Sequence, residues 1–94
     1  MFRTTAAADA DVVELFRFGT ERYGLAKADD YVSGLGEALY RLAANPRMAR
    51  ERTEVRPPVR LYTYMAHVIV YIIEDEDVLI LRVLHGSSDW INAL

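Results

Sequence analysis

Cysteine is absent from this chain of 94 residues, which excludes disulfide bonds and thiolate zinc sites. No apolar run is long enough to cross a bilayer. The first residues also lack the basic segment and apolar core of a signal peptide. These absences favour a cytoplasmic protein with no membrane partner. A chain of this length holds one hydrophobic core, so we expect a single domain over residues 1–94.

An excess of positive charge is missing as well, because the net charge is −3. Proteins whose main partner is the nucleic-acid backbone usually carry a large positive excess, so we expect no direct nucleic-acid binding. Residues 41–60 are nevertheless basic, with two glutamates against six arginines: Arg41, Arg47, Arg50, Arg52, Arg56 and Arg60. This segment is either a solvated loop with weak ion pairs or a docking surface for an acidic partner.

Two helices are predicted in the first half of the chain. Thr5 is a suitable N-cap for the first helix, and Gly24 ends it as a C′ glycine. The second helix runs from about Leu25 to Ala44 and ends at Asn45-Pro46, because proline disfavours the α region for the residue before it. So short a break predicts an antiparallel α-hairpin. Its apolar positions at helical spacing are Ala8, Val12, Leu15, Phe16, Gly19 and Tyr23, then Ala28, Tyr31, Leu35, Leu39 and Leu42.

The second half of the chain reads as strands. Val59–Tyr64 is followed by a tight turn and by the apolar run His67–Ile73, and a second apolar run begins at Val78 after an acidic turn. Met1–Thr4 is a short segment that would pair with these strands. We therefore predict an α+β fold, in which an antiparallel α-hairpin packs on a mainly antiparallel sheet of three to four strands. The sheet face away from the helices is a candidate partner surface.

His67 and His85 start and end neighbouring strands, so we expect the two rings to lie close together. In principle they could serve acid–base cleavage of RNA, but a strand-end histidine more often bonds to the backbone or to solvent. We therefore expect no catalytic residue and no cofactor. Two histidines without a carboxylate at ligand spacing do not make a metal-binding pattern, so we also expect no metal site. Arg82, in an apolar strand, needs a carboxylate such as Asp89 or a charged partner.

The last residues suit a short helix. Ser87 or Ser88 is the expected N-cap, with Asp89 near the positive end of the helix. Trp90, the single tryptophan, either anchors a partner or covers the core beside Leu84.

This order of elements resembles the ParE/RelE superfamily of bacterial toxins. The residues that carry the resemblance are Asp11-Val12, Leu15, Tyr23-Gly24, Ala28, Tyr31, Leu35, Leu39, Leu42, Asn45-Pro46, His67–Tyr71, Ile80–Gly86 and Asp89. The resemblance implies the toxin of a type II toxin–antitoxin system. Such a toxin inhibits DNA gyrase by binding and is neutralised by a cognate ParD-like antitoxin in a toxin–antitoxin hetero-oligomer.

Two alternatives stay open. The RelE-like branch cleaves mRNA on the ribosome, and a degenerate member would bind its antitoxin but poison nothing. Many RelE-like members are basic and carry an arginine on the strand that corresponds to His67–Tyr71, whereas this chain is acidic and has Val68-Ile69-Val70 there. We therefore favour the non-catalytic toxin. The expected antitoxin contacts are Arg52, Arg56, Arg60 and Arg82, and the expected target contacts are His85, Asp89 and Trp90.

Overall fold

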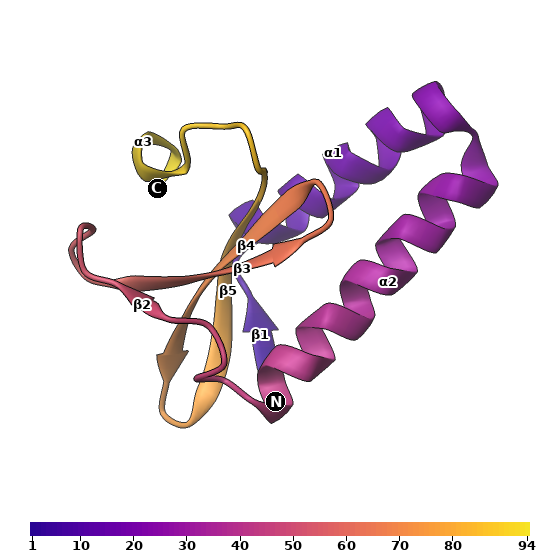
Figure 1. Ribbon diagram of the computed structural model, residues 1–94. Helices are drawn as coiled ribbons and strands as arrows, with labels where there is room; N and C mark the ends of the chain where they lie inside the picture. Colours follow the sequence, from indigo (N-terminus) through magenta and orange to yellow (C-terminus); the bar gives the residue numbers. More distant parts are fainter.

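The computed structural model of residues 1–94 has two helices lying on one face of a five-stranded sheet (Figure 1). The strands follow the order β1-β5-β4-β3-β2 across the sheet. No helix is both long and apolar enough to cross a membrane. The elements are β1 (Phe2–Thr4), α1 (Ala6–Tyr23), α2 (Leu25–Ala44), β2 (Glu51–Arg52), β3 (Val59–Tyr64), β4 (His67–Glu74), β5 (Asp77–His85) and α3 (Trp90–Ala93).

The predicted α+β fold is confirmed, but the sheet has five strands rather than three to four. β3, β4 and β5 form the expected antiparallel meander. β1 pairs with β5 in the parallel sense, and β2 adds a two-residue edge opposite Arg60 and Val59. β2 is short and polar, and it shows no alternation of apolar and polar residues. The sequence therefore contains no signal that predicts it.

Local sequence explains the α-hairpin. The Thr5 side chain accepts a hydrogen bond from the Ala8 N–H at 3.0 Å and donates one to the Leu81 carbonyl at 2.7 Å, which ties the start of α1 to β5. Gly24 is the single residue between the helices. Its φ of 91° lies in the left-handed region that favours glycine. The two helices therefore turn back on each other with almost no loop.

The core lies between the helices and the sheet. Its largest fully buried side chains include Tyr71, Leu35 and Leu42. The Tyr71 hydroxyl donates to the Pro46 carbonyl at 2.7 Å and so fixes the exit of α2 beneath the sheet. Tyr23, which we predicted on the buried face of the first helix, is instead 62% exposed, because α1 extends past the edge of the sheet (Figure 1).

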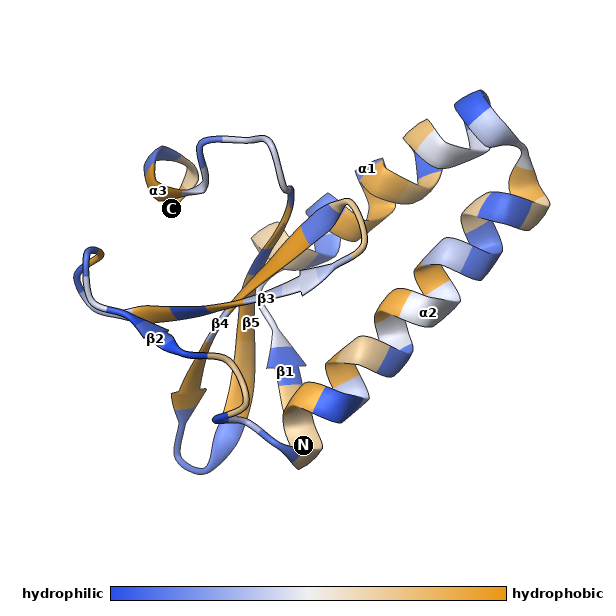
Figure 2. Cartoon of the chain, in the orientation of Figure 1, coloured by the Kyte–Doolittle hydropathy of each residue, from blue (hydrophilic) through white to orange (hydrophobic).

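The second face of the sheet meets the C-terminal tail. Strand alternation places Val70 and Arg82 on this face, opposite each other in the register. Arg82 Nη1 donates to the Ala93 carbonyl at 2.8 Å, and α3 lies on the side of the sheet away from α2 (Figure 1). Figure 2 shows that apolar residues are concentrated in β4 and β5. The tail therefore covers part of an apolar face.

The predicted serine cap of the last helix is wrong. Asp89 occupies the N-cap position of α3 and makes no capping hydrogen bond to the backbone. Ser88 instead donates its hydroxyl to the His85 carbonyl at 2.7 Å, and Ser87 bonds to the His85 ring. The serines therefore close the end of β5 and are not available to begin the helix.

Candidate functional site

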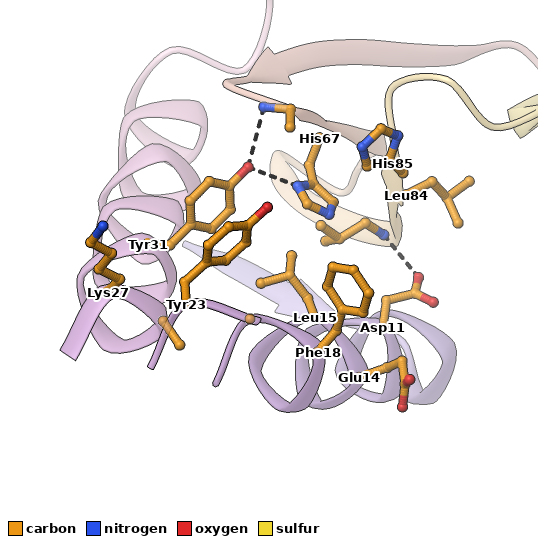
Figure 3. A pocket seen from close by; sticks show the side chains of 14 residues that line it. Asp11, Glu14, Leu15, Phe18, Tyr23, Lys27, Tyr31, His67, Leu84 and His85 are labelled. Carbon is orange, nitrogen blue, oxygen red and sulfur yellow. Dashed lines mark hydrogen bonds between the residues drawn. The ribbon is translucent and has the colours of Figure 1, made fainter. Parts of the chain in front are cut away.

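A groove of about 680 Å³ opens between the tip of the α-hairpin and the ends of β4 and β5. Its apolar lining includes Leu15 and Phe18 from α1 and Leu84 from β5 (Figure 3). Phe18 is 54% exposed and Tyr23, also in the lining, is more exposed still. Large apolar side chains gathered around one open groove are typical of a partner-binding surface.

Tyr31 and His67 form one wall of the groove. The Tyr31 hydroxyl lies 2.7 Å from His67 Nδ1 and accepts a hydrogen bond from the Ala66 N–H at 3.2 Å (Figure 3). The Tyr31 ring also packs edge-on against Tyr64, whose hydroxyl donates back to the Tyr31 carbonyl. Burial raises the pKa of Tyr31, so this hydroxyl is neutral at physiological pH.

The two histidines meet, as predicted. His67 and His85 are paired in the β4–β5 register, and their ring centroids lie 5.4 Å apart. His67 is half-buried, whereas His85 is exposed. Burial, and then the nearby His85, lower the pKa of His67 below its ordinary value. His85 Nδ1 is 2.7 Å from the Ser87 hydroxyl, so both rings are held by neighbours.

Arg82 is held by a carboxylate from α1. Its Nε and Nη2 donate to Asp11 at 2.7 Å and 2.9 Å, and Asp11 also accepts the Val83 N–H at 2.9 Å. The carboxylate partner is therefore Asp11, and the sequence-based prediction of Asp89 is wrong. The third bond of Arg82 goes to the tail at Ala93, so all three of its hydrogen bonds are made within the domain.

The other charged groups at the groove differ in how far they are paired. Glu14 receives two bonds from Arg17 Nη2 and one from its Nε, the shortest at 2.7 Å. Lys27 lines the groove from α2 and makes no hydrogen bond or ion pair. Thus the carboxylates of the groove are engaged, and its lysine is free.

The arginine segment lies elsewhere. Arg52 makes a long 3.4 Å contact to Glu54, Arg56 is exposed, and Arg60 Nη1 donates to the Ala49 carbonyl at 2.6 Å. Arg60 also lines a second, smaller hollow at the opposite end of β4, which includes Ile73. The expected antitoxin contacts therefore do not form one cluster. Arg82 bonds to α1 and to the C-terminal tail, whereas Arg52 and Arg60 bond within residues 49–60.

The expected target contacts are divided too. His85 lies in the groove, whereas Asp89 and the half-buried Trp90 belong to the tail. Asp89 accepts a hydrogen bond from the Asn92 side chain at 2.5 Å. Sequence reasoning did not assign Lys27 to the site, because only the folding of the hairpin over the sheet brings it there. No group of three His, Asp or Glu side chains in the structure is arranged to hold a metal ion.

Comparisons with known proteins agree on one family. The family model described as the ParE toxin of the type II toxin–antitoxin system parDE matches residues 2–90. The chain is 32% identical over 85 residues to Toxin ParE3 of Caulobacter vibrioides, covering 90% of this chain and 85% of that protein. It is 34% identical over 84 residues to Toxin ParE1 of Mycobacterium tuberculosis, covering 88% and 86%.

The fold has a match among solved structures. A chain of the chromosomal ParDE toxin–antitoxin system from P. aeruginosa superposes with a TM-score of 0.78 at 21% identity, covering 89% of this chain and 92% of that one. At that level of identity, the superposition supports the shared fold.

Proposed function

Because this chain belongs to the ParE toxin family of type II toxin–antitoxin systems, we propose that it arrests growth in the cytoplasm by binding DNA gyrase. The proposed action is non-catalytic, and a ParD antitoxin neutralises it in a hetero-oligomeric complex. The chain acts in this proposal as one toxin domain, without a cofactor and without direct contact to nucleic acid.

The observation that carries the proposal is the open apolar groove between the hairpin tip and the ends of β4 and β5. A small domain that exposes large apolar side chains around one hollow gains free energy when a partner covers them. A segment that orders on binding can cover such a surface with few residues. The groove is therefore the proposed seat of the antitoxin.

The chemistry of the groove supports binding over catalysis. RNA cleavage needs a general base for the 2′-hydroxyl and a cation at the phosphate. The Nδ1 atoms of His67 and His85 are both held by hydrogen bonds, and Arg82 donates three bonds to Asp11 and Ala93. Lys27 is then the unpaired cation of the groove, and the groove carboxylates that could act as a base, Asp11 and Glu14, are both paired. A ribosome-dependent endoribonuclease is therefore the second candidate function. The third is a non-toxic family member that still binds its antitoxin.

Induced expression without antitoxin separates the three candidates. We expect DNA damage and altered plasmid supercoiling with intact mRNA. Cut mRNA would favour the endoribonuclease, and normal growth would favour the non-toxic member. Purified gyrase then provides the direct assay, in which supercoiling activity should fall in proportion to added toxin.

Two histidine variants test the non-catalytic part. Folded His67→Ala and His85→Ala proteins should keep comparable toxicity, because loss of a general acid or base costs an enzyme about 10²–10⁴-fold in rate. Melting curves of the purified variants supply the folding control. Abolished toxicity in a variant of native stability would contradict a binding mechanism.

The arginine segment is proposed as a second antitoxin contact. Changing Arg52, Arg56 and Arg60 together to Glu should weaken the complex and reduce the salt dependence of its dissociation constant, because these side chains would meet acidic groups of the partner. Unchanged affinity and unchanged salt dependence would leave the segment a solvated loop. Asp89 and Trp90 are retained as proposed target contacts, whereas His85, expected from the sequence to contact the target, lines the groove and is proposed instead as an antitoxin contact.

A further inference from the structure

The hydrogen bonds around Tyr31 determine which nitrogen of His67 carries the proton. The Ala66 N–H donates to the Tyr31 oxygen at 3.2 Å, so the hydroxyl proton must point elsewhere. Its two acceptors are His67 Nδ1 at 2.7 Å and the Tyr64 carbonyl at 3.5 Å. The shorter contact is much the stronger. His67 Nδ1 therefore accepts, and the proton of the neutral ring is assigned to Nε2.

The same reasoning applies to His85. Its Nδ1 accepts the backbone N–H of Ser87 at 3.2 Å. A backbone N–H can only donate, so Nδ1 cannot carry a proton in the neutral ring. Both histidines thus present an Nε2–H donor, from rings 5.4 Å apart at the wall of the groove. Neither Nε2 has an acceptor within the chain.

None of the groups that face this histidine pair accepts a hydrogen bond from its Nε2–H donors. On α1, Asp11 is bonded to Arg82 and the Val83 N–H, and Glu14 is bonded to Arg17. The remaining titratable groups around the pair are the free amine of Lys27 and the phenols of Tyr23, Tyr31 and Tyr64. The groove therefore presents two unpaired Nε2–H donors and the unpaired Lys27 ammonium, while its carboxylates are already paired with arginines.

We propose that the histidine pair recognises a carboxylate: an Asp or Glu side chain of the antitoxin segment accepts the Nε2–H groups of His67 and His85. Apolar side chains beside that acidic residue occupy the groove against Leu15 and Phe18. This inference rests on the proposed antitoxin complex and names the chemistry of its contact. An acidic segment suits the site because its charge is complementary to the free Lys27.

The proposed contact makes binding depend on pH. In the free chain, burial and His85 hold the pKa of His67 low, and a carboxylate in contact raises the pKa of a histidine. Binding then takes up protons, so affinity rises as pH falls from above the pKa in the complex toward the pKa in the free protein. Uptake of one proton changes the dissociation constant by up to about tenfold per pH unit within that window.

The test measures the dissociation constant of the full-length antitoxin encoded in the same parDE system at pH 8, 7 and 6. The wild-type complex should tighten by about three- to tenfold between pH 8 and pH 6. The His67→Gln and His85→Gln double variant keeps amide N–H donors but cannot be protonated near neutrality. Whatever its affinity at pH 8, it should show less than about twofold pH dependence between pH 8 and pH 6.

A second variant leaves the half-buried His67 unchanged, so its folding does not depend on a substitution at that position. His85 is exposed, so His85→Leu should fold, and loss of one donor to a charged group should weaken binding about tenfold at every pH. Long-range ¹⁵N correlation spectra of the free chain read the tautomers directly. Both rings should be in the Nε2–H form at pH 8, and Tyr31→Phe should shift only His67 toward the Nδ1–H form.

The outcomes separate this inference from the proposed function. Full pH dependence in the double variant, or wild-type affinity in His85→Leu, would overturn the carboxylate contact while the antitoxin complex stands. Nδ1–H rings in the free chain would do the same. If wild-type chain and variants alike fail to bind the antitoxin, the proposed complex is wrong and the histidine contact with it.

Discussion

Replacing Asp11 with alanine should be among the most damaging single changes at the edge of the groove. The carboxylate accepts three hydrogen bonds, two from Arg82 and one from the Val83 N–H, all between 2.7 and 2.9 Å. The side chains of Asp11 and Arg82 are only 14% and 27% exposed. The variant would leave a guanidinium and a backbone N–H largely shielded from water without their acceptor.

The expected cost is about 2–4 kcal/mol in the free energy of unfolding. Hydrogen bonds to charged groups contribute about 1.5–3 kcal/mol each, and breaking a fully buried pair costs about 3–5 kcal/mol. The partial exposure of both side chains lowers the figure for this site. For a domain of this size, each kcal/mol shifts the melting temperature by about 4–8 °C, so a fall of about 8–32 °C is expected.

Glu14→Ala is the matched control. Glu14 stands on the same helix and also forms a bidentate pair with an arginine, but both partners are 63% exposed. Exposed pairs contribute about 0.2–1 kcal/mol. Thermal and urea unfolding of the two variants, with Arg82→Met completing a double-mutant cycle, isolate the buried pair. If Asp11→Ala loses no more stability than Glu14→Ala, the reasoning from burial is refuted.

Four further variants test other parts of the fold. Gly34→Ala should cost about 1–3 kcal/mol because its new methyl group would overlap the Tyr64 hydroxyl, whereas Gly36→Ala meets no atom and should raise the melting temperature slightly. Since His67 has a lowered pKa, the unfolded chain binds its proton more tightly, so stability should fall below about pH 6.5. This fall, followed by melting curves, should be smaller in His67→Gln. Removal of residues 90–94 should leave a folded chain that binds antitoxin but no longer inhibits gyrase; unfolding would instead assign the tail to the core.

Local signals explain how much of the fold could be predicted. Thr5 and Gly24 act within a few residues of themselves, so the limits of α1 and the start of α2 follow from the chain. Runs of β-branched residues similarly mark β4 and β5. The parallel sense of β1 has no such signal, because it depends on where α1 crosses the sheet and not on the sequence of Phe2–Thr4.

The site was less accessible to prediction because its contacts join distant parts of the chain. Neighbouring strand ends were enough to predict that His67 and His85 meet. The lone Arg82 in an apolar strand correctly predicted a carboxylate partner, but Asp89, its neighbour in sequence, proved to be the wrong choice. Asp11 lies 71 residues away, and only the docking of α1 against the edge of β5 brings it into reach.

The two proposed antitoxin contacts set a minimum length for the segment that reaches both. The histidine pair lies at the start of β4, and the hollow that Arg60 lines includes Ile73, six positions further along the strand. At about 3.3 Å per residue, these ends are about 20 Å apart. A segment touching both needs acidic residues separated by about 6 extended or about 13 helical residues. Antitoxin truncations should therefore lose the pH dependence and the salt dependence of binding one at a time, since each depends on a different end. If the truncation that removes the fewest antitoxin residues abolishes both the pH dependence and the salt dependence of binding, the idea of two separate contacts is wrong.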